Sequence, residues 1–166
     1  MTLHIDAAEV TDLAHAWRQA PELVAREMTA ATTEAQLLLL REVKERTPTG
    51  ATSALRESIH ADAPLRESER IMGIVGTSIA HAVPVELGTR PHFPPIAPLV
   101  DWVRAKLGIT DDDEATGVAF SIARKIALRG TLAIGMFHRG LTARESDIQR
   151  IYAAATQRIA TGLTDG

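Results

Sequence analysis

The side chains best suited to chemistry gather around one carboxylate. His81 and His92 flank Glu86, and two imidazoles with a carboxylate are a ligand set that zinc accepts. Their spacing matches no established metal-binding motif, and loop histidines are mostly solvated or hydrogen-bonded. We therefore expect no metal site here. We expect the Glu86 carboxylate to accept hydrogen bonds from the Gly88 and Thr89 amides and so to pin a loop.

Other forms of catalysis have weaker support. The chain has no cysteine, which excludes a thiolate nucleophile, a thiolate metal site and a disulfide framework. Ser53, Ser58 and Ser78 lie in no nucleophile-elbow context and have no evident base. No glycine-rich phosphate loop is present. We expect no catalytic residue, no cofactor and no enzymatic activity, and a small metal-dependent enzyme is the least favoured alternative.

One segment has a charge pattern suited to nucleic acid. Between residues 115 and 144 every charged residue is basic, although the net charge of the chain is −3. A basic surface of this kind binds phosphates or an acidic protein. Three of its cations suit the C-terminal end of a helix, namely Arg124, Lys125 and Arg129. Arg139 and Arg144 remain as contacts to DNA or a partner, so a nucleic-acid-contacting module is the main alternative.

A stiff loop positions the central candidates. Five of the eight prolines lie between Pro84 and Pro98. Each proline fixes φ, removes a donor and pushes the preceding residue toward an extended conformation. We expect an edge strand at 83–87, since a strand tolerates proline only at an edge, followed by a proline-rich loop at 90–98. Such an edge can pair with a neighbouring chain.

Hydrophobic periodicity and capping residues supply the other elements. In chain order we expect an N-terminal helix at 6–20, a long helix at 21–46 beginning at Pro21, a β-hairpin plus the edge strand at 55–89, two helices at 98–129, a strand at 131–137, and a C-terminal helix at 142–160 opened by a Thr142/Glu145 capping box.

These elements predict a single α+β domain over residues 1–166. A small, mainly antiparallel sheet of three to four strands would pack against one long N-terminal helix, with further helices after the proline-rich loop. A chain of 166 residues with 45% hydrophobic content suits one domain. The longest aliphatic run, Leu37 to Leu40, is far too short for a membrane span, so we expect a soluble intracellular chain without a membrane partner.

The order of the motifs resembles a family of phage proteins. A long helix precedes Thr49-Gly50 and the 55–59 segment, a glycine-bearing strand follows at 71–79, and Val85-Glu86-Leu87-Gly88-Thr89 comes before the prolines, with Met136-Phe137 before the closing helix. This arrangement is similar to the neck or tail-completion proteins of long-tailed, siphophage-type bacteriophages. The similarity covers roughly residues 21 to 160. The chain departs from the family in an insertion at 51–54 and in lacking a proline near Phe137.

The resemblance implies a structural virion protein at the neck or the top of the tail. Made in the host bacterial cytoplasm, such a minor tail component forms a ring, with six copies favoured to match tail symmetry. It would join head-completion or stopper proteins to the tail terminator or tube, with transient contact to packaged DNA. The interface residues that we expect are Val83, Val85, Glu86, Leu87, Gly88, Thr89, Phe93, Ile96 and Trp102.

Overall fold

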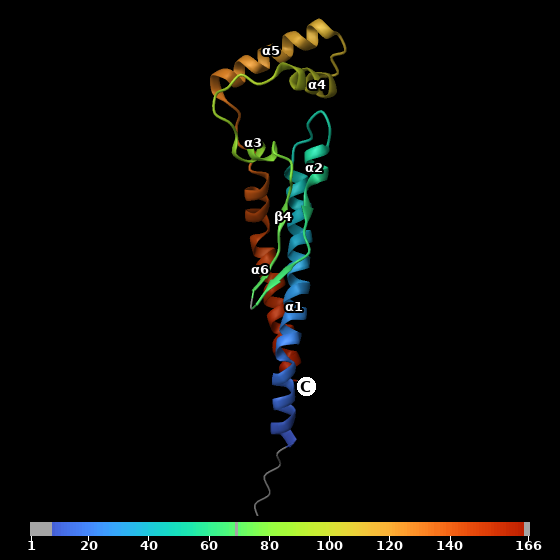
Figure 1. Ribbon diagram of the computed structural model, residues 1–166, viewed down its shortest axis with the longest axis vertical. Helices are drawn as coiled ribbons and strands as arrows, with labels where there is room; N and C mark the ends of the chain where they lie inside the picture. The colour runs from blue at the N-terminus through green and yellow to red at the C-terminus, as the bar shows by residue number, and fades with distance from the viewer. Residues whose placement is uncertain (1–7, 69, 165–166) are drawn as a thin grey trace, which may run out of the picture. The chain divides into compact units, whose positions relative to one another are not determined.

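The chain divides into two units. The computed structural model describes residues 8–68 and 70–164, with side chains from Ala20 onward. As far as they are described, the first unit consists of Met1–Leu38, Ala61–Ile74 and Arg144–Gly166, and the second of Leu39–His60 and Val75–Ala143. Figure 1 labels the helices and strand β4. The expectation of one domain stays a prediction.

The N-terminal element is one helix, α1, which spans Ala8–Arg46 with Pro21 inside it. The expected separation into helices at 6–20 and 21–46 is therefore wrong, and the expected start at Asp6 lies outside the described residues. An interior proline removes one helical hydrogen bond and its ring crowds the carbonyl four residues earlier, which costs about 3 kcal/mol, but a helix can continue through it with a kink. The residues on both sides of Pro21 have ordinary helix propensity, which favours continuation.

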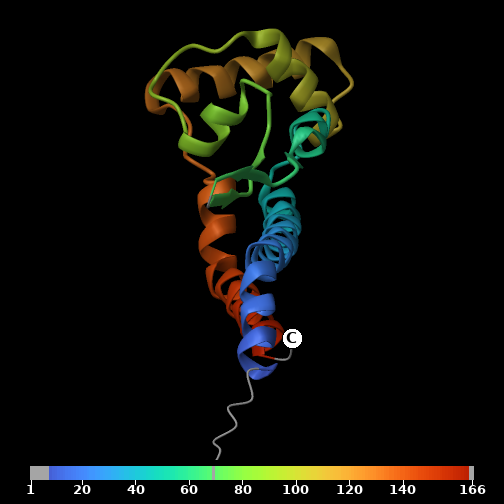
Figure 2. The ribbon, with the colours of Figure 1, turned by 60° about the horizontal axis from the view of Figure 1, so that its bottom comes forward.

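In the first unit α1 lies beside α6, the last helix, which spans Met136–Thr164 (Figures 1 and 2). The Arg158 guanidinium donates to Glu27 at 2.7 Å, and the Tyr152 hydroxyl donates to Thr32 at 3.2 Å. The pKa of Glu27 is lowered, chiefly by the hydrogen bond from Arg158. The helices run antiparallel, and small side chains let them approach: Ala25, Ala31, Ala35 and Ala155 are buried.

The first unit also holds a short hairpin. Strand β2, Leu65–Glu67, pairs antiparallel with β3, Arg70–Met72, so that Leu65 faces Met72. The expected single strand at 71–79 is wrong, because β3 ends before Gly73 and β4, Val75–Gly76, follows as a separate strand. A side chain at Gly73 would come within 2.7 Å of the Gln36 side chain, so the backbone approaches α1 closely there.

Gln36 ties the base of this hairpin to α1. Its side chain is 5% exposed, and its Nε2 donates to the Asp62 carbonyl at 3.0 Å and to the Ile74 carbonyl at 2.9 Å. One buried amide group thus holds both ends of the 62–74 segment. Each bond to a carbonyl is worth about 1 kcal/mol, and an unsatisfied buried group costs more.

Replacing Gln36 with glutamate should release the hairpin. An ionised carboxylate has no donor and would face two carbonyl oxygens, so the free energy of unfolding should fall by about 2 kcal/mol. Hydrogen exchange measured by mass spectrometry should show faster exchange in residues 61–76. Gln149→Glu makes the same chemical change at an exposed position of α6. Equal exchange in the two variants would contradict this role for Gln36.

The strands form two small sheets instead of one. Strand β1, His60–Ala61, pairs with β4, and β2 pairs with β3. The α+β class is confirmed, but a sheet of three to four strands is wrong. One reason is that the first expected hairpin strand starts as helix α2, Ala54–Ser58. Leu55 and Ile59 are four residues apart and both are buried, which is helical spacing.

One hydrophobic core of the second unit lies at the end of α1. Val43 and Met136 are completely buried there, and the Thr47 hydroxyl lies 3.3 Å from the Met136 sulfur. The other buried members are Leu55, Ile59 and Ala82. Gly140 of α6 faces Val43, where an added methyl group would meet the Val43 side chain at 3.0 Å. This core fixes the start of α6 against the last turns of α1.

Helices α4, Ile96–Leu107, and α5, Asp112–Arg129, pack together in the second unit (Figure 1). The two helices expected at 98–129 are confirmed, with Pro98 inside the first turn of α4, where a proline removes no helical hydrogen bond. Gly108 ends α4 with φ +70°, and Asp111 caps α5 by accepting from the Glu114 amide at 2.8 Å. No helix in the described ranges is apolar over a length that would cross a bilayer.

Residues 82–87 form helix α3, Ala82–Leu87, so the expected edge strand is wrong. Pro84 is the third residue of this helix, and amides in the first helical turn need no acceptor within the helix. The Val85 amide then donates to the His81 carbonyl at 3.4 Å. The proline that we took as the mark of an edge strand therefore lies at the start of a helix.

Candidate functional site

Two of the expected interface residues are exposed to solvent on helix α3. Val83 is 61% exposed and Leu87 is 72% exposed, and their four-residue spacing places them on one side of the helix. Ala82 is buried, and Val85 packs partly buried against the core that contains Val43 and Met136. The helix therefore anchors itself through one side and presents apolar side chains on the other.

A two-residue backbone bridge joins the residues that follow α3 to a second segment, at Thr131. The Thr89 amide donates to the Thr131 carbonyl at 3.1 Å, and the Thr131 amide donates to the Thr89 carbonyl at 3.2 Å. At Gly88, where φ is +72°, an added side chain would meet Thr131 and Leu132 backbone atoms. Leu132 is 92% exposed. We call Val83, Leu87 and Leu132 the apolar patch.

Glu86 holds helix α3 to the first turn of α6. Its carboxylate accepts from the Phe137 amide at 2.9 Å and from the His138 amide at 3.0 Å. The Gly135 amide also donates to the Glu86 carbonyl at 3.1 Å. The expectation that Glu86 binds the Gly88 and Thr89 amides is wrong. The first turn of α6 has free amides and a positive helix-dipole end, and both favour a carboxylate.

This contact also explains why the end of the chain differs from its prediction. The 131–137 strand is wrong, since Thr131 makes only an isolated bridge and α6 begins at Met136. The capping box is wrong too, because Thr142 lies inside α6 and its hydroxyl bonds the His138 carbonyl at 3.0 Å. A distant glutamate takes the capping role that local sequence assigned to Thr142.

Replacing Glu86 with alanine should leave two helix amides without an acceptor. Loss of a helix cap of this kind costs about 1–2 kcal/mol of the free energy of unfolding, to be measured by urea titration. Glu86→Gln keeps one acceptor oxygen without the charge, so its cost should be roughly half as large. Glu67→Ala removes an exposed carboxylate from β2 as a control. A Glu86→Ala variant as stable as Glu67→Ala would contradict the cap.

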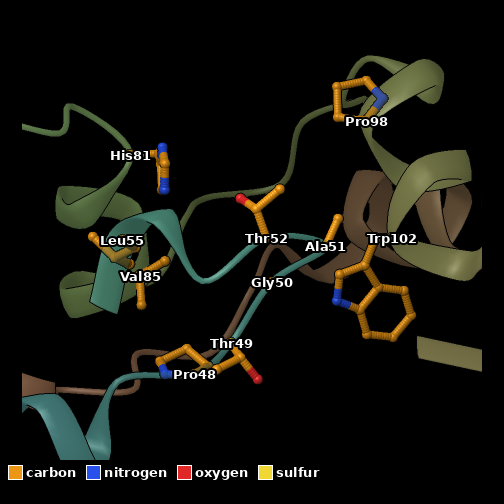
Figure 3. Close-up of a pocket in the computed structure, with 10 residues that line it drawn as sticks. All are labelled: Pro48, Thr49, Gly50, Ala51, Thr52, Leu55, His81, Val85, Pro98 and Trp102. Carbon is orange, nitrogen blue, oxygen red and sulfur yellow. The ribbon is translucent and has the colours of Figure 1, made fainter. Parts of the chain in front are cut away.

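Trp102 lines an apolar pocket of about 390 Å³ (Figure 3). The 48–52 loop, α2, α3 and α4 form its walls, and the Lys106 ammonium of α4 donates to the Thr49 hydroxyl at 2.8 Å. His81 is the one titratable side chain that lines this pocket. The pocket offers an apolar surface to a ligand but no acid and base pair of its own.

Two other expected interface residues have partners within the chain. The Phe93 ring meets the Phe120 ring of α5 edge to face, with centroids 5.6 Å apart, although both rings are about half exposed. Ile96 packs into the core between α4 and α5 around Val103. The proline-rich loop is therefore fastened to the helical pair, and Phe93 still presents part of its ring outward.

The histidines do not join Glu86 in a metal site. His81 is exposed at the start of α3, and the His92 ring lies 2.9 Å from the Arg90 carbonyl. The described part of the chain contains no cluster of three His, Asp or Glu side chains placed to hold a metal ion. Glu86 already binds two amides of α6, which leaves it poorly suited to a ligand role.

The two cations expected to contact DNA lie in different surroundings. Arg139 is exposed, with one weak contact of 3.5 Å to the Ile134 carbonyl. Arg144 pairs with Asp147 at 3.2 Å, and the hydrogen bonds from Arg144 and then Arg150 lower the pKa of Asp147. Arg144 is therefore engaged within its own helix, and only Arg139 keeps the exposure expected of a phosphate contact.

Sequence reasoning missed Leu132, because the apolar residues 131–137 were predicted to form a strand of the sheet. The signal was present in the flanking glycines, since Gly130 and Gly135 both have positive φ and mark turns at the two ends of a short connection. The resulting arrangement is an apolar patch whose backbone is held by the Thr89–Thr131 bridge. Comparison with protein-family models, curated proteins and solved structures finds no match for this chain.

Proposed function

We propose that this chain is a structural virion protein of a long-tailed phage. It acts as a neck or tail-completion protein, assembles as a ring of six copies at the head–tail joint, and connects head-completion proteins to the tail. In this role the protein binds other copies and other virion proteins, and it catalyses no reaction. The order of motifs from the long helix to Val85–Thr89 supports this function by resemblance, and the exposed apolar patch supports association.

The observation that carries the proposal is that the apolar patch is exposed on a fixed backbone. Scattered exposed leucines need no explanation, but here Leu87 and Leu132 are on segments joined by the Thr89–Thr131 bridge. Glu86 fastens one of these segments to α6. A partner that covers the patch therefore gains apolar burial while little ordering entropy is lost.

The proposed interface still includes residues 83–87, but it uses side-chain burial instead of main-chain pairing. Main-chain pairing through an edge strand at 83–87 is not available, because those residues form α3. Side-chain burial of Val83, Leu87 and Leu132 takes over that role. Trp102 and its pocket add a second apolar feature that can receive a side chain from a neighbouring protein.

The location can be tested directly on virions. An antibody raised against the purified chain and carrying gold particles is applied to intact virions of the phage that encodes it, and electron micrographs are scored by label position. Label at the joint between head and tail is the expected result. Label at the tail tip, or virions that contain none of the chain, would overturn the proposal.

The alternatives have less support. A nucleic-acid-contacting module would use the basic 115–144 segment, where Arg144 is engaged with Asp147. It predicts DNA affinity that falls steeply with salt and is lost when Arg139 and Arg144 are neutralised. A metal-dependent enzyme would need His81, Glu86 and His92 together, and the described residues do not form such a cluster.

A further inference from the structure

The C-terminal half of α5 has a solvent-facing side of mixed character. Ser121, Arg124, Lys125, Leu128 and Arg129 line a shallow hollow of about 440 Å³. Their spacing of three and four residues places them on one side of the helix, opposite the buried alanines. Leu128 is 77% exposed among the cations. We call this set the basic face.

The helix dipole does not account for the basic face. Cations are favoured at a helix C-terminus, but the effect falls off within the last turn, and only Arg129 lies in the last turn of α5. Within the described residues, neither Arg124 nor Lys125 has an ion-pair partner. Two neighbouring, unpaired cations beside an exposed leucine offer a surface that is complementary to an acidic, partly apolar partner.

A surface of matching chemistry lies at the other end of the same helix. Asp113 and Glu114 are exposed in the first turn of α5 and have no ion-pair partner among the described residues, whereas Asp112 pairs with Arg104. The exposed side chain of Leu107 precedes them at the end of α4. We call Leu107, Asp113 and Glu114 the acidic end.

The two surfaces cannot satisfy each other within one chain. Asp113 and Lys125 are twelve residues apart on a rigid helix, which is roughly 18 Å along its axis. This separation exceeds the screening length of about 8 Å at physiological salt. Asp113 and Glu114 are therefore too far from Arg124 and Lys125 of the same chain to pair with them.

We infer that the basic face of α5 in one copy docks on the acidic end of α5 in the next copy, head to tail. This inference rests on the proposed function, because a closed ring requires two different surfaces on each copy. Arg124 and Lys125 would pair with Asp113 and Glu114, while Leu128 meets Leu107 at the centre. The two surfaces then attract each other locally, although two whole chains, each with a net charge of −3, repel each other.

Two reversed variants test this contact. The first carries Arg124→Glu with Lys125→Glu, and the second carries Asp113→Lys with Glu114→Lys. The mass of each is measured by light scattering at physiological salt, alone and on purified tails that lack the protein. Each variant alone should assemble at least about tenfold more weakly than the natural chain. A one-to-one mixture should recover the ring, because each surface of one variant then complements a surface of the other.

Two controls separate folding and net charge from the contact. Arg41→Glu with Arg56→Glu makes the same change in net charge at exposed positions of α1 and α2 and should assemble normally. Asp113→Asn with Glu114→Gln removes the acidic charges without adding repulsion, so it should assemble with intermediate strength. Circular dichroism should show the natural helix content in all variants, and a reversed variant that unfolds is replaced by its neutral counterpart.

The possible outcomes test the head-to-tail contact and the proposed function separately. Reversed variants that assemble as well as the natural chain overturn the head-to-tail contact and leave the ring standing, and so does a mixture that gives no recovery. A natural chain that neither assembles nor binds tails overturns the proposed function itself. Growth that stops at a dimer overturns the head-to-tail arrangement. Binding of a short DNA duplex that is lost in Arg124→Glu with Lys125→Glu, with assembly unchanged, assigns the basic face to nucleic acid instead.

Discussion

Gly130→Ala is expected to lower the free energy of unfolding by about 3 kcal/mol. Gly130 has φ +68° and ψ −159°, a region that only glycine adopts without strain of about 1–3 kcal/mol. An added Cβ would also lie 1.9 Å from the Thr89 carbonyl oxygen, which is a backbone atom and cannot rotate away. The clash would separate Thr89 from Thr131 and so disturb the backbone under the apolar patch. Urea titration measures the change.

Two other glycines provide matched controls. Gly108 has a similar φ of +70° with open space around it, so Gly108→Ala should cost only about 1 kcal/mol. Gly117 lies inside α5 with open space, and Gly117→Ala should stabilise the protein by roughly 0.5–1 kcal/mol. If Gly130→Ala costs no more than Gly108→Ala, the close approach of Gly130 to Thr89 is not a constraint on folding.

Leu87→Arg combined with Leu132→Arg is expected to abolish assembly while leaving the fold intact. Both side chains are exposed, so the free energy of unfolding should change by less than about 0.5 kcal/mol for each. In an assembled ring the same arginines would be buried without partners, which costs several kcal/mol, at least about a hundredfold in affinity. Mass measurement across a concentration series, with and without tails, reports the loss.

The choice of positions matters for this test. Val85→Arg would place a charge against the core that surrounds Met136, so a loss of assembly could reflect unfolding. Leu65→Arg with Leu141→Arg changes two exposed leucines elsewhere and serves as the control. Equal loss of assembly in both double variants would show that the effect is not specific to the apolar patch.

Local sequence signals predict the helix ends correctly where a single residue type determines the backbone conformation. Gly108 and Gly130 end α4 and α5, and Asp111 caps α5, as their residue types predict. The buried side of α5 was harder to predict. The completely buried residues there are Ala115, Ala119 and Ala123, whereas hydrophobic periodicity favours the larger and only half-buried Ile122. Alanine gives a weak hydrophobic signal, yet it lets two helices approach closely.

The sequence predicts which residues form the candidate site, but it predicts the wrong secondary structure for them. Val83–Leu87 combines β-branched residues with a proline, a pattern that favours an edge strand. Whether Pro84 lies in a strand or in the first turn of a helix depends on distant contacts, such as those of Ala82 with the core. The Glu86 cap on α6 joins residues more than fifty positions apart, and no local pattern can indicate it.

The most direct test of the proposed association is the mass of the purified chain in solution, alone and after mixing with tails that lack it. The natural chain should form a particle of six copies on the tails, and the Leu87→Arg, Leu132→Arg variant should not. A natural chain that stays monomeric and ignores tails at every concentration would contradict the account. Assembly of the double variant as strong as that of the natural chain would contradict the role of the apolar patch.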